Sequence, residues 1–296
     1  MDLRVLQYFL AVAREQTISG AAEALHMTQP PLSRQLKELE EELGRQLFLR
    51  GSRQITLTRE GMLLRRRAEE ILALVEKTKS EVRSVDETVE GDVFIGGGES
   101  EGMRPIARAV AAVRRDHPGI RFHFYSGDGY DVAERLDQGL LDFGAFIEPT
   151  DVRKYDSLRL PRPDAWGLLM RRDDPLAGRE AITPADLLQV PLLPSRQLMG
   201  ENGLAGWLGC DAAQLHIVST GNLLTNLLLL VEEGVGCALT LDGLARNRGE
   251  NLVFRPLAPR LVSWIFLVWK KYPLFTPAAE LFLRRLKAEL DGSASA

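Results

Sequence analysis

Hydrophobic residues in the first 58 positions follow helical spacing in three successive stretches. In the first stretch they lie on one face of a helix, at Leu3, Leu6, Phe9, Leu10 and Ala13. Ser19 can cap a second helix, and Thr28 can cap a third. Pro30 and Pro31 fall in the first turn of the third helix, where a missing N–H is tolerated and the fixed φ helps the helix to start. The prolines therefore mark the beginning of a helix, and Gly44 marks its end.

The third helix has an apolar face that predicts core packing. Its apolar positions step by four, three and four residues, at Leu32, Leu36, Leu39 and Leu43. Beyond the helix the pattern indicates a short hairpin, with a strand over 47–50, a turn at Gly51-Ser52, and a second strand around Ile55 and Leu57. Two helices joined by a tight turn and followed by a small basic hairpin are typical of a winged helix-turn-helix.

The opposite face of the third helix predicts DNA binding. Five of its positions gather near the N-terminal end: Gln29, Pro30, Ser33, Arg34 and Lys37. In a helix-turn-helix this end meets base edges in the major groove, where Arg34 has the fork to bind guanine and Gln29 the amide to bind adenine. Arg50 and Arg53 lie where a wing would contact phosphates or the minor groove. A small helical core with a solvated polar face explains the leucines equally well, but not the absence of acidic residues between positions 26 and 37.

A long helix follows the hairpin, because no Gly or Pro occurs between residues 62 and 90. Its apolar seam steps alternately by four and three residues, at Leu64, Ala68, Ile71, Val75, Thr78, Val82 and Val85. This heptad pattern is typical of a helix that pairs with another helix, and two-fold pairing would supply two recognition helices for two half-sites. We therefore predict dimerisation through Leu64, Ala68, Ile71, Val75 and Val82. The alternative is a long helix packed on its own domain.

From residue 92 onward, short apolar runs alternate with helical segments. We expect strands over 92–96, 120–126, 142–147, 165–171, 191–194, 214–220, 236–241 and 262–270. We expect helices near 102–116, 130–138, 183–189, 199–208, 222–233 and 277–290. This alternation predicts an α/β domain with a mainly parallel sheet.

Polar loops follow several of these strands and predict a ligand cleft. They are 97–100, 126–128, Glu148, Ser195-Arg196 and 220–222. Ligands of such sheets bind at the carboxyl ends of strands, near the N-termini of the following helices. Each loop alone is commonly just a turn, yet together they define one cleft. The glycines at 96–98 have neither GxxxxGK[ST] nor GxGxxG spacing, so they indicate a tight turn and not a phosphate loop.

Charge is unevenly distributed along the 296 residues. The formal net charge is −4 for the whole sequence. Residues 1–67 carry 11 Lys and Arg against 8 Asp and Glu, whereas the remainder carries 26 against 33. The N-terminal segment is therefore suited to phosphates, and the rest is acidic.

The sequence favours a binding protein over an enzyme. The histidines lack HExxH spacing, neither GxSxG nor CxxC occurs, and we expect all four to be structural: His26, His117, His123 and His216. Cys210 and Cys237 make neither a disulfide framework nor a metal cluster, so we interpret them as buried, reduced thiols, with a redox switch as the alternative. We predict no catalytic residue, metal or cofactor. Lacking a long apolar run and a secretory signal, the chain is expected in the cytoplasm, away from membranes.

One stretch of the chain resembles the DNA-binding domain of LysR-type transcriptional regulators: AAEALHMTQPPLSRQLKELEEELGRQLFLR, followed by ITLTREG. The specific features are the order Gln-Pro-x-x-Ser-Arg-Gln, a Leu-Glu-x-x-Leu-Gly turn, a Leu-Phe wing and Leu-Thr-x-x-Gly. The similarity is strong over residues 1–65. It continues more weakly in DPLAGREAITPADLLQVPLL and LLVEEGVGCALT, which resemble the family's effector domain.

The resemblance implies a domain organisation. A winged helix-turn-helix would occupy 1–58, a linker and dimerisation helix 59–90, and a periplasmic-binding-protein-like α/β effector domain 91–296. Subdomain one would comprise about 92–161 and 267–296, subdomain two about 162–266, with chain crossings near 160–164 and 261–266. Such proteins pair through the linker helix and assemble as tetramers. Their binding to DNA changes when a small molecule occupies the cleft.

The resemblance also implies contact residues. The family's DNA-contacting positions fall here on Thr28, Gln29, Pro30, Ser33, Arg34, Lys37 and Arg53. Its effector-contacting loops fall near Ser100, Asp128, Phe146, Ser195, Asn222 and Thr240. Position 20, often basic in relatives, is Gly20, so one phosphate contact is expected to be missing. Glu99 and Asp128 place acid beside the cleft, which conflicts with the carboxylate effectors common in the family. We add Arg196 as the cation available to such an anion, and the ligand class stays open.

We therefore predict a sequence-specific bacterial transcription regulator. Its partners would be double-stranded operator DNA, a small-molecule effector and further copies of itself, as a dimer or a tetramer. A constitutive DNA-binding regulator with an empty cleft is one alternative. A soluble solute-binding or enzymatic α/β protein is the other.

Overall fold

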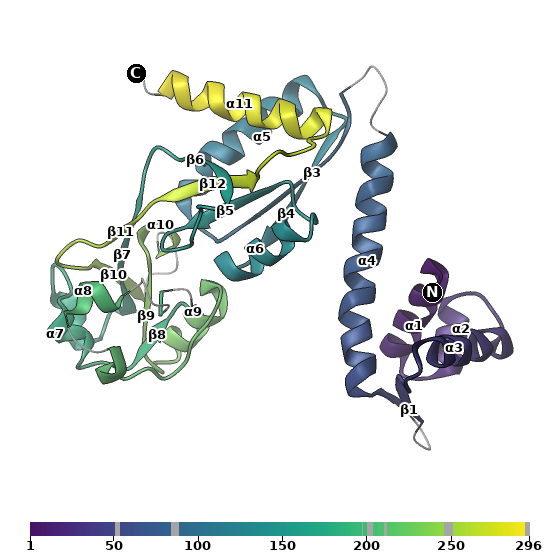
Figure 1. Ribbon diagram of the computed structural model, residues 1–296. Coiled ribbons are helices and arrows are strands. Elements are labelled where there is room, and N and C mark those ends of the chain that lie inside the picture. The colour runs from purple at the N-terminus through teal and green to yellow at the C-terminus, as the bar shows by residue number, and fades with distance from the viewer. Residues whose placement is uncertain are drawn as a thin grey trace. The chain divides into compact units, whose positions relative to one another are not determined.

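The computed structural model divides into two compact units, Met1–Val82 and Arg83–Ala296 (Figure 1). The structure describes residues 1–50, 54–83, 89–196, 198–199, 204–209, 212–245 and 251–293. The long helix belongs to the first unit in this division. The three-domain boundaries at 58/59 and 90/91 stay predictions.

The first unit is a winged helix-turn-helix followed by a long helix. Its elements are α1 (Leu3–Glu15), α2 (Ile18–Ala24), α3 (Gln29–Leu43), β1 (Phe48–Arg50), β2 (Ile55–Leu57) and α4 (Arg59–Arg83). The rings of Phe9 and Phe48 lie 5.1 Å apart in its buried core, which joins the helices to the wing. β1 and β2 pair antiparallel with Phe48 opposite Leu57. The expected wing is thus confirmed, and its turn at Gly51-Ser52 lies outside the described residues.

Local details at the helix ends differ from the sequence prediction. Thr17, and not Ser19, caps α2, because the helix begins two residues earlier than predicted and the Thr17 hydroxyl accepts a hydrogen bond from Gly20 N at 3.1 Å. Thr28 occupies the cap position of α3 in extended backbone, but its side chain makes no capping hydrogen bond. Leu43 is 40% exposed instead of buried, since it lies in the last turn of α3, at the edge of the core.

The second unit contains two sheets with their covering helices. The first sheet is built from β3 (Gly91–Gly97), β4 (Ile120–Ser126), β5 (Phe143–Ile147), β6 (Tyr155–Arg159) and β12 (Ile265–Lys270), with helices α5 (Arg104–Asp116), α6 (Gly129–Asp137) and α11 (Pro277–Ser293). The second is built from β7 (Asp164–Arg171), β8 (Leu192–Pro194), β9 (Cys237–Leu241), β10 (Leu252–Pro256) and β11 (Val262–Ser263), with helices α7 (Pro184–Leu187), α8 (Ala205–Leu208), α9 (Leu224–Glu232) and α10 (Asp242–Ala245). Short 3-10 turns occupy Glu101–Met103, Pro175–Gly178 and Ala212–Gln214.

The first sheet is a three-layer arrangement with strand order β4-β3-β5-β12-β6. Alternate side chains face opposite layers, because the side-chain period of a strand is two. Ile95 and Phe143 belong to the core that α5 and α11 cover, whereas Phe146 and Val268 pack with residues of α6. In Figure 1, α5 and α11 lie on one side of this sheet and α6 on the other.

The second sheet has the order β10-β7-β9-β8, with β11 also pairing with β7. One face packs against the leucines of α9, and the other joins the main core of the unit. The chain passes from the first sheet to the second between β6 and β7, and returns between β11 and β12. Two connections thus join two α/β halves, which positions any site between the sheets on residues from both.

The expectation of a mainly parallel sheet is wrong. β3 pairs parallel with β4 and β5, and β8 pairs parallel with β9. The remaining pairings are antiparallel, because β7 and β12 follow the connecting segments and run back along their neighbours. The α/β class is confirmed, as two mixed sheets.

Several predicted elements of the second unit also change. The predicted strand 214–220 forms only isolated bridges, such as Ile217 with Leu192. The described part of the predicted helix 199–208 is helical at Ala205–Leu208 alone. The predicted strand 262–270 is interrupted at Trp264, where the chain leaves one sheet for the other. β6 and β10 are edge strands that the sequence pattern missed, because neither shows a clear alternation of buried and exposed residues.

Candidate DNA-binding face and effector cavity

The recognition helix α3 separates its apolar and polar residues onto two faces. Leu32, Leu36 and Leu39 are buried in the core of the first unit. On the other face Gln29, Pro30, Arg34 and Lys37 are exposed and Ser33 is half-buried, and Thr28 is exposed at the cap. The structure thus brings these six predicted contact residues together on one exposed surface at the N-terminal end of α3.

Arg34 and Lys37, the two cationic residues of α3, each form an ion pair with a glutamate one turn further along the helix. Arg34 Nε lies 2.8 Å from Glu38 Oε1, and Lys37 Nζ lies 3.4 Å from Glu41 Oε1. The hydrogen bond to Glu38 raises the pKa of Arg34 above its usual value. Sequence reasoning noted the acid-free stretch up to position 37 but missed this partner immediately beyond it. This hydrogen bond uses Nε of the guanidinium, so a base that needs Nε as a donor competes with Glu38 for it.

The wing is tied to α3 by a carboxylate that the sequence analysis did not single out. Glu40 Oε1 accepts hydrogen bonds from the backbone N–H groups of Leu47 at 2.7 Å and Phe48 at 3.2 Å. β1 therefore starts from a fixed position relative to α3. The side chain of Arg50 and the whole of Arg53 lie outside the described residues, so both stay predicted wing contacts.

Gly20 has a packing role. A Cβ at this position would lie 2.8 Å from the Thr17 hydroxyl that caps α2. A larger side chain here would disturb that cap, which gives a physical reason for glycine at a position where a basic residue was expected.

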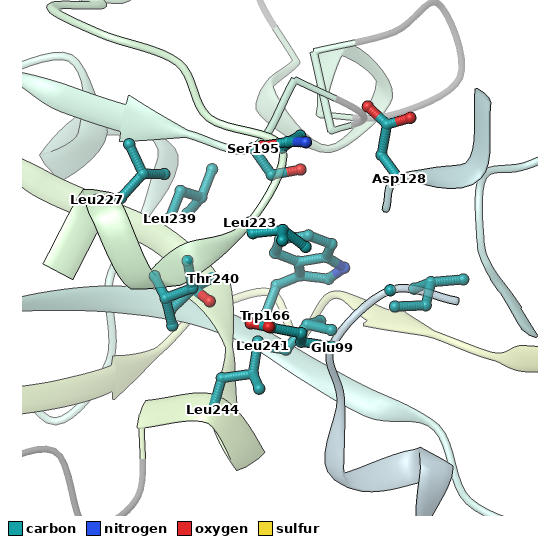
Figure 2. Close-up of a pocket in the computed structure, with 14 residues that line it drawn as sticks. Glu99, Asp128, Trp166, Ser195, Leu223, Leu227, Leu239, Thr240, Leu241 and Leu244 are labelled. Atoms are coloured by element: carbon teal, nitrogen blue, oxygen red, sulfur yellow. The ribbon is translucent and has the colours of Figure 1, made fainter. Parts of the chain in front are cut away.

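A cavity lies between the two sheets of the second unit. It is partly open to solvent and holds about 550 Å³ of space, solvent at its mouth included. Its lining consists of Gly98, Glu99, Asp128, Ile147, Trp166, Ser195, Asn222, Leu223, Leu224, Leu227, Leu239, Thr240, Leu241 and Leu244. Figure 2 shows side chains from both sheets around it. Four predicted effector residues, Asp128, Ser195, Asn222 and Thr240, are among the lining. The cavity sits where β3, β5 and β8 end, as expected for ligands of parallel strands.

Three predicted effector residues, Phe146, Ser100 and Arg196, lie elsewhere. Phe146 is 1% exposed and packs edge-on against Tyr155, with ring centroids 5.4 Å apart, because its neighbour Ile147 takes the cavity-facing position in β5. Ser100 caps the turn at Glu101–Met103 and hydrogen-bonds the carboxylate of Asp164. Burial raises the pKa of Asp164, and the Ser100 hydrogen bond counteracts it. Phe146 and Ser100 support the wall instead of lining the cavity.

Arg196 bridges the two halves of the unit instead of lining the cavity. Its Nε donates to Asp128 Oδ2 at 2.8 Å, and its Nη2 lies 3.2 Å from Asp131 Oδ1. Asp128 is 3% exposed and also caps α6, accepting from the N–H groups of Tyr130 and Asp131 at 3.1 Å each. The bond joins the loop after β8 to the loop after β4. The pairing with Asp128 raises the pKa of Arg196.

The predicted polar loops contribute only part of the lining, because most of it is apolar. Leucines from α9, β9 and α10, together with Trp166, supply this surface. Sequence reasoning missed them because the segment LLTNLLLL has leucines on every side of its helix, so no stripe marks those facing the cavity. Glu148 lines a second cavity of about 670 Å³, together with Thr150, Trp166 and Ser263.

Two further titratable side chains, His123 and Cys237, are engaged by their neighbours. His123 Nε2 lies 2.8 Å from Asp92 Oδ1, and its ring stacks on Phe94. Burial, with Asp174 nearby, raises the pKa of Cys237 to about 12, which disfavours the reactive thiolate; Cys210 lies outside the described residues. In the described parts of the chain, no helix has both the length and the apolar character to span a membrane.

A winged helix-turn-helix joined to a two-sheet domain with a cavity between the sheets defines a ligand-responsive DNA-binding regulator. Residues 3–62 match the bacterial regulatory helix-turn-helix protein, lysR family, and residues 86–291 match the LysR substrate binding domain. The chain belongs to the LysR family of transcriptional regulators.

Individual relatives agree with this assignment. The chain is 31% identical over 288 residues to the SDS degradation transcriptional activation protein of a Pseudomonas species, covering 94% of this chain and 93% of that protein. It is 33% identical over 204 residues to the transcriptional regulator BsdA of Bacillus subtilis, covering 69% of each. The fold matches the crystal structure of CbnR with a TM-score of 0.77 at 21% identity, over 98% and 99% of the two chains. It matches full-length BenM with a TM-score of 0.55 at 25% identity, over 100% and 97%.

Proposed function

We propose that this regulator reads its operator through the exposed face of α3 and senses a small molecule in the cavity between its two sheets. The observation that carries this proposal is the cavity itself, because its walls come from both halves of the effector domain. A molecule bound there contacts both halves at once. It can therefore change their relative position, provided that it binds the two arrangements with different affinity.

The DNA-contacting residues are Thr28, Gln29, Pro30, Ser33, Arg34 and Lys37, with Arg50 and Arg53 on the wing. The exposure of the α3 residues on one surface supports this assignment for the helix. Asp128, Ser195, Asn222 and Thr240, which line the cavity, are the effector contacts. We assign the protein no catalytic role, and we place its action in the cytoplasm, where its DNA is.

Self-association completes the proposal. The first two residues of the α4 seam belong to the fold of the single chain: Leu64 packs against the core of the first unit, and Ala68 is buried. Further along, Leu74 and Val82 are exposed. Pairing through this later part of α4, from Ile71 and Val75 to Val82, would place two recognition helices on two half-sites.

The test is binding of the full-length chain to DNA selected from a random double-stranded library. Arg34→Ala should weaken binding by about 1–3 kcal/mol and relax the preference at one base pair. Lys37→Ala should weaken binding to all sequences alike and lower the salt slope by about one. Arg153→Ala is the matched control, because Arg153 pairs with Asp151 in an exposed loop of the effector domain. If Arg34→Ala binds the selected site as the parent does, the assignment of the recognition face is wrong.

A further inference from the structure

The charged groups around the effector cavity differ in whether they already have a hydrogen-bond or ion-pair partner. Arg196 already donates to Asp128 and Asp131. The Trp166 indole N–H donates to Ser263 Oγ at 2.8 Å, so it too is occupied. Glu99 lines the same cavity and is half-buried, and within the described residues its carboxylate has no hydrogen bond or ion pair. Among the described residues, Glu99 is therefore the carboxylate of this cavity wall that no cation or hydrogen-bond donor engages.

The surface beside Glu99 is apolar and aromatic. Figure 2 draws Glu99 with Trp166, Leu241 and Leu244 toward one end of the cavity, and Ser195 and Asp128 toward the other. An indole face attracts a cation electrostatically, and a carboxylate in an apolar environment attracts it more strongly than in water. Trp166 and Glu99 together thus offer both kinds of partner for a positive charge.

The cavity wall also offers neutral polar groups. Ser195, Asn222 and Thr240 carry a hydroxyl or an amide, and the first turn of α9 receives no side-chain capping bond from Leu223. These groups can donate to an oxygen of any charge, whether a hydroxyl, a carbonyl or a carboxylate. They alone do not favour an anion, and an anion in this cavity would also meet the charge of Glu99.

We propose that the effector is an apolar molecule with a positively charged amine head, bound with the head at Glu99 and Trp166 and the apolar body among the leucines of α9, β9 and α10. This inference rests on the proposed function, in which the cavity is the effector site. Glu99 is the residue that selects the head group. Arg196 is not an anchor for the ligand, because Asp128 and Asp131 hold its guanidinium.

The test compares matched molecules that differ only in the head. One set is 2-phenylethylamine, 2-phenylethanol and phenylacetate, and the other is hexylamine, hexanol and hexanoate. Affinities for the full-length protein are measured by calorimetry, and DNA binding to the selected operator is measured with each compound present. The amine should bind about 10- to 100-fold more tightly than its alcohol, and the carboxylate should bind more weakly than either.

Glu99→Gln should remove the advantage of the amine and leave the alcohol unchanged. Glu101→Gln is the matched control, because Glu101 lies two residues away, makes an ion pair with Arg104 and is absent from the cavity lining. This control should leave all affinities as in the parent.

Three results would count against the inference. If a carboxylate binds most tightly and changes the affinity for DNA, the cationic head is rejected. The effector-sensing function then still stands. An amine affinity that Glu99→Gln does not change would reject Glu99 as its anchor. Absence of binding by every member of both sets at millimolar concentration would count against the cationic effector and the sensing cavity alike.

Discussion

At the residue scale, burial sets the chemistry of Cys237. The Sγ atom lies 3.5 Å from Asp174 Oδ2, and burial, followed by the nearby carboxylate, raises the thiol pKa from 9.0 to about 12. The folded thiol therefore stays protonated at pH 8, where a free thiol would begin to ionise. Because the folded pKa exceeds the unfolded value, this group's contribution to stability is complete below about pH 9 and is lost as the pH rises towards 12.

This predicts a thiol that resists modification. In a Cys210→Ser variant, the remaining thiol of the native protein should react with a disulfide reagent at pH 8 at least about 100 times more slowly than after unfolding in denaturant. The denatured protein serves as the internal control. Rapid reaction of the native protein at pH 8 would show that Cys237 is accessible and would reopen a redox role.

At the residue scale too, a difference of one position along a strand decides which side chain lines the cavity. Phe146 and Ile147 are neighbours in β5, and both are apolar. Only Ile147 lines the cavity, because successive side chains of a strand point to opposite faces. β5 is buried on both faces, so its sequence has no polar alternation to reveal which of the two is which.

At the element scale, α4 combines two packing roles along one seam. The first turns of α4 pack against the core of the first unit. In its last turns, the side chain of Val82 is 69% exposed. Val82→Glu should therefore leave the fold of a single chain unchanged. In a symmetric pair it would bring like charges together and bury them, which should weaken self-association about 10- to 100-fold.

Sedimentation equilibrium of the full chain measures this effect directly. Glu76→Gln provides the control, because Glu76 is exposed on another side of the same helix and pairs with Lys79. Unchanged association of Val82→Glu would move the pairing surface away from the later turns of α4.

Short-range rules account for most of the elements that could be predicted. α3 was predictable because its prolines, its leucine spacing and Gly44, which adopts φ +63°, are all local features. β6 and β10 were not, because an edge strand is stabilised by hydrogen bonds to a partner distant in sequence. The false strand at 214–220 has the opposite cause, since its residues have strand character but form only isolated bridges.

At the scale of the whole effector domain, the bond between Arg196 and Asp128 ties one half to the other. The carboxylate is nearly fully buried, whereas the guanidinium is half-exposed. Removing the cation would leave a buried carboxylate with only its capping N–H groups. Arg196→Met should therefore lower stability by about 1–2 kcal/mol, seen as a fall in Tm of roughly 2–8 °C.

A double-mutant cycle with Asp128→Asn isolates the bond, because asparagine can still accept the capping hydrogen bonds of α6. The coupling should be positive for this pair and near zero for the control pair Arg153 and Asp151, which are both exposed and lie in one loop. An equal coupling in the two cycles would mean that the bridge between the halves has no special role.

The sequence by itself determined the class of the protein and the polar residues on the exposed face of α3. Caps, turn residues and helical spacing act over a few positions, so the winged helix-turn-helix and the surface with Gln29, Arg34 and Lys37 follow from local patterns. The same holds for the order of most strands and helices in the effector domain, and for four of the polar residues that line its cavity.

Only the tertiary structure decided which groups remain available to a ligand. Arg196 and Glu99 are both charged loop residues beside the cleft in the sequence. Folding brings Asp128, 68 positions away, to the guanidinium and leaves the Glu99 carboxylate facing leucines and Trp166. Contacts between distant segments depend on how the two sheets pack, and no local pattern encodes that packing.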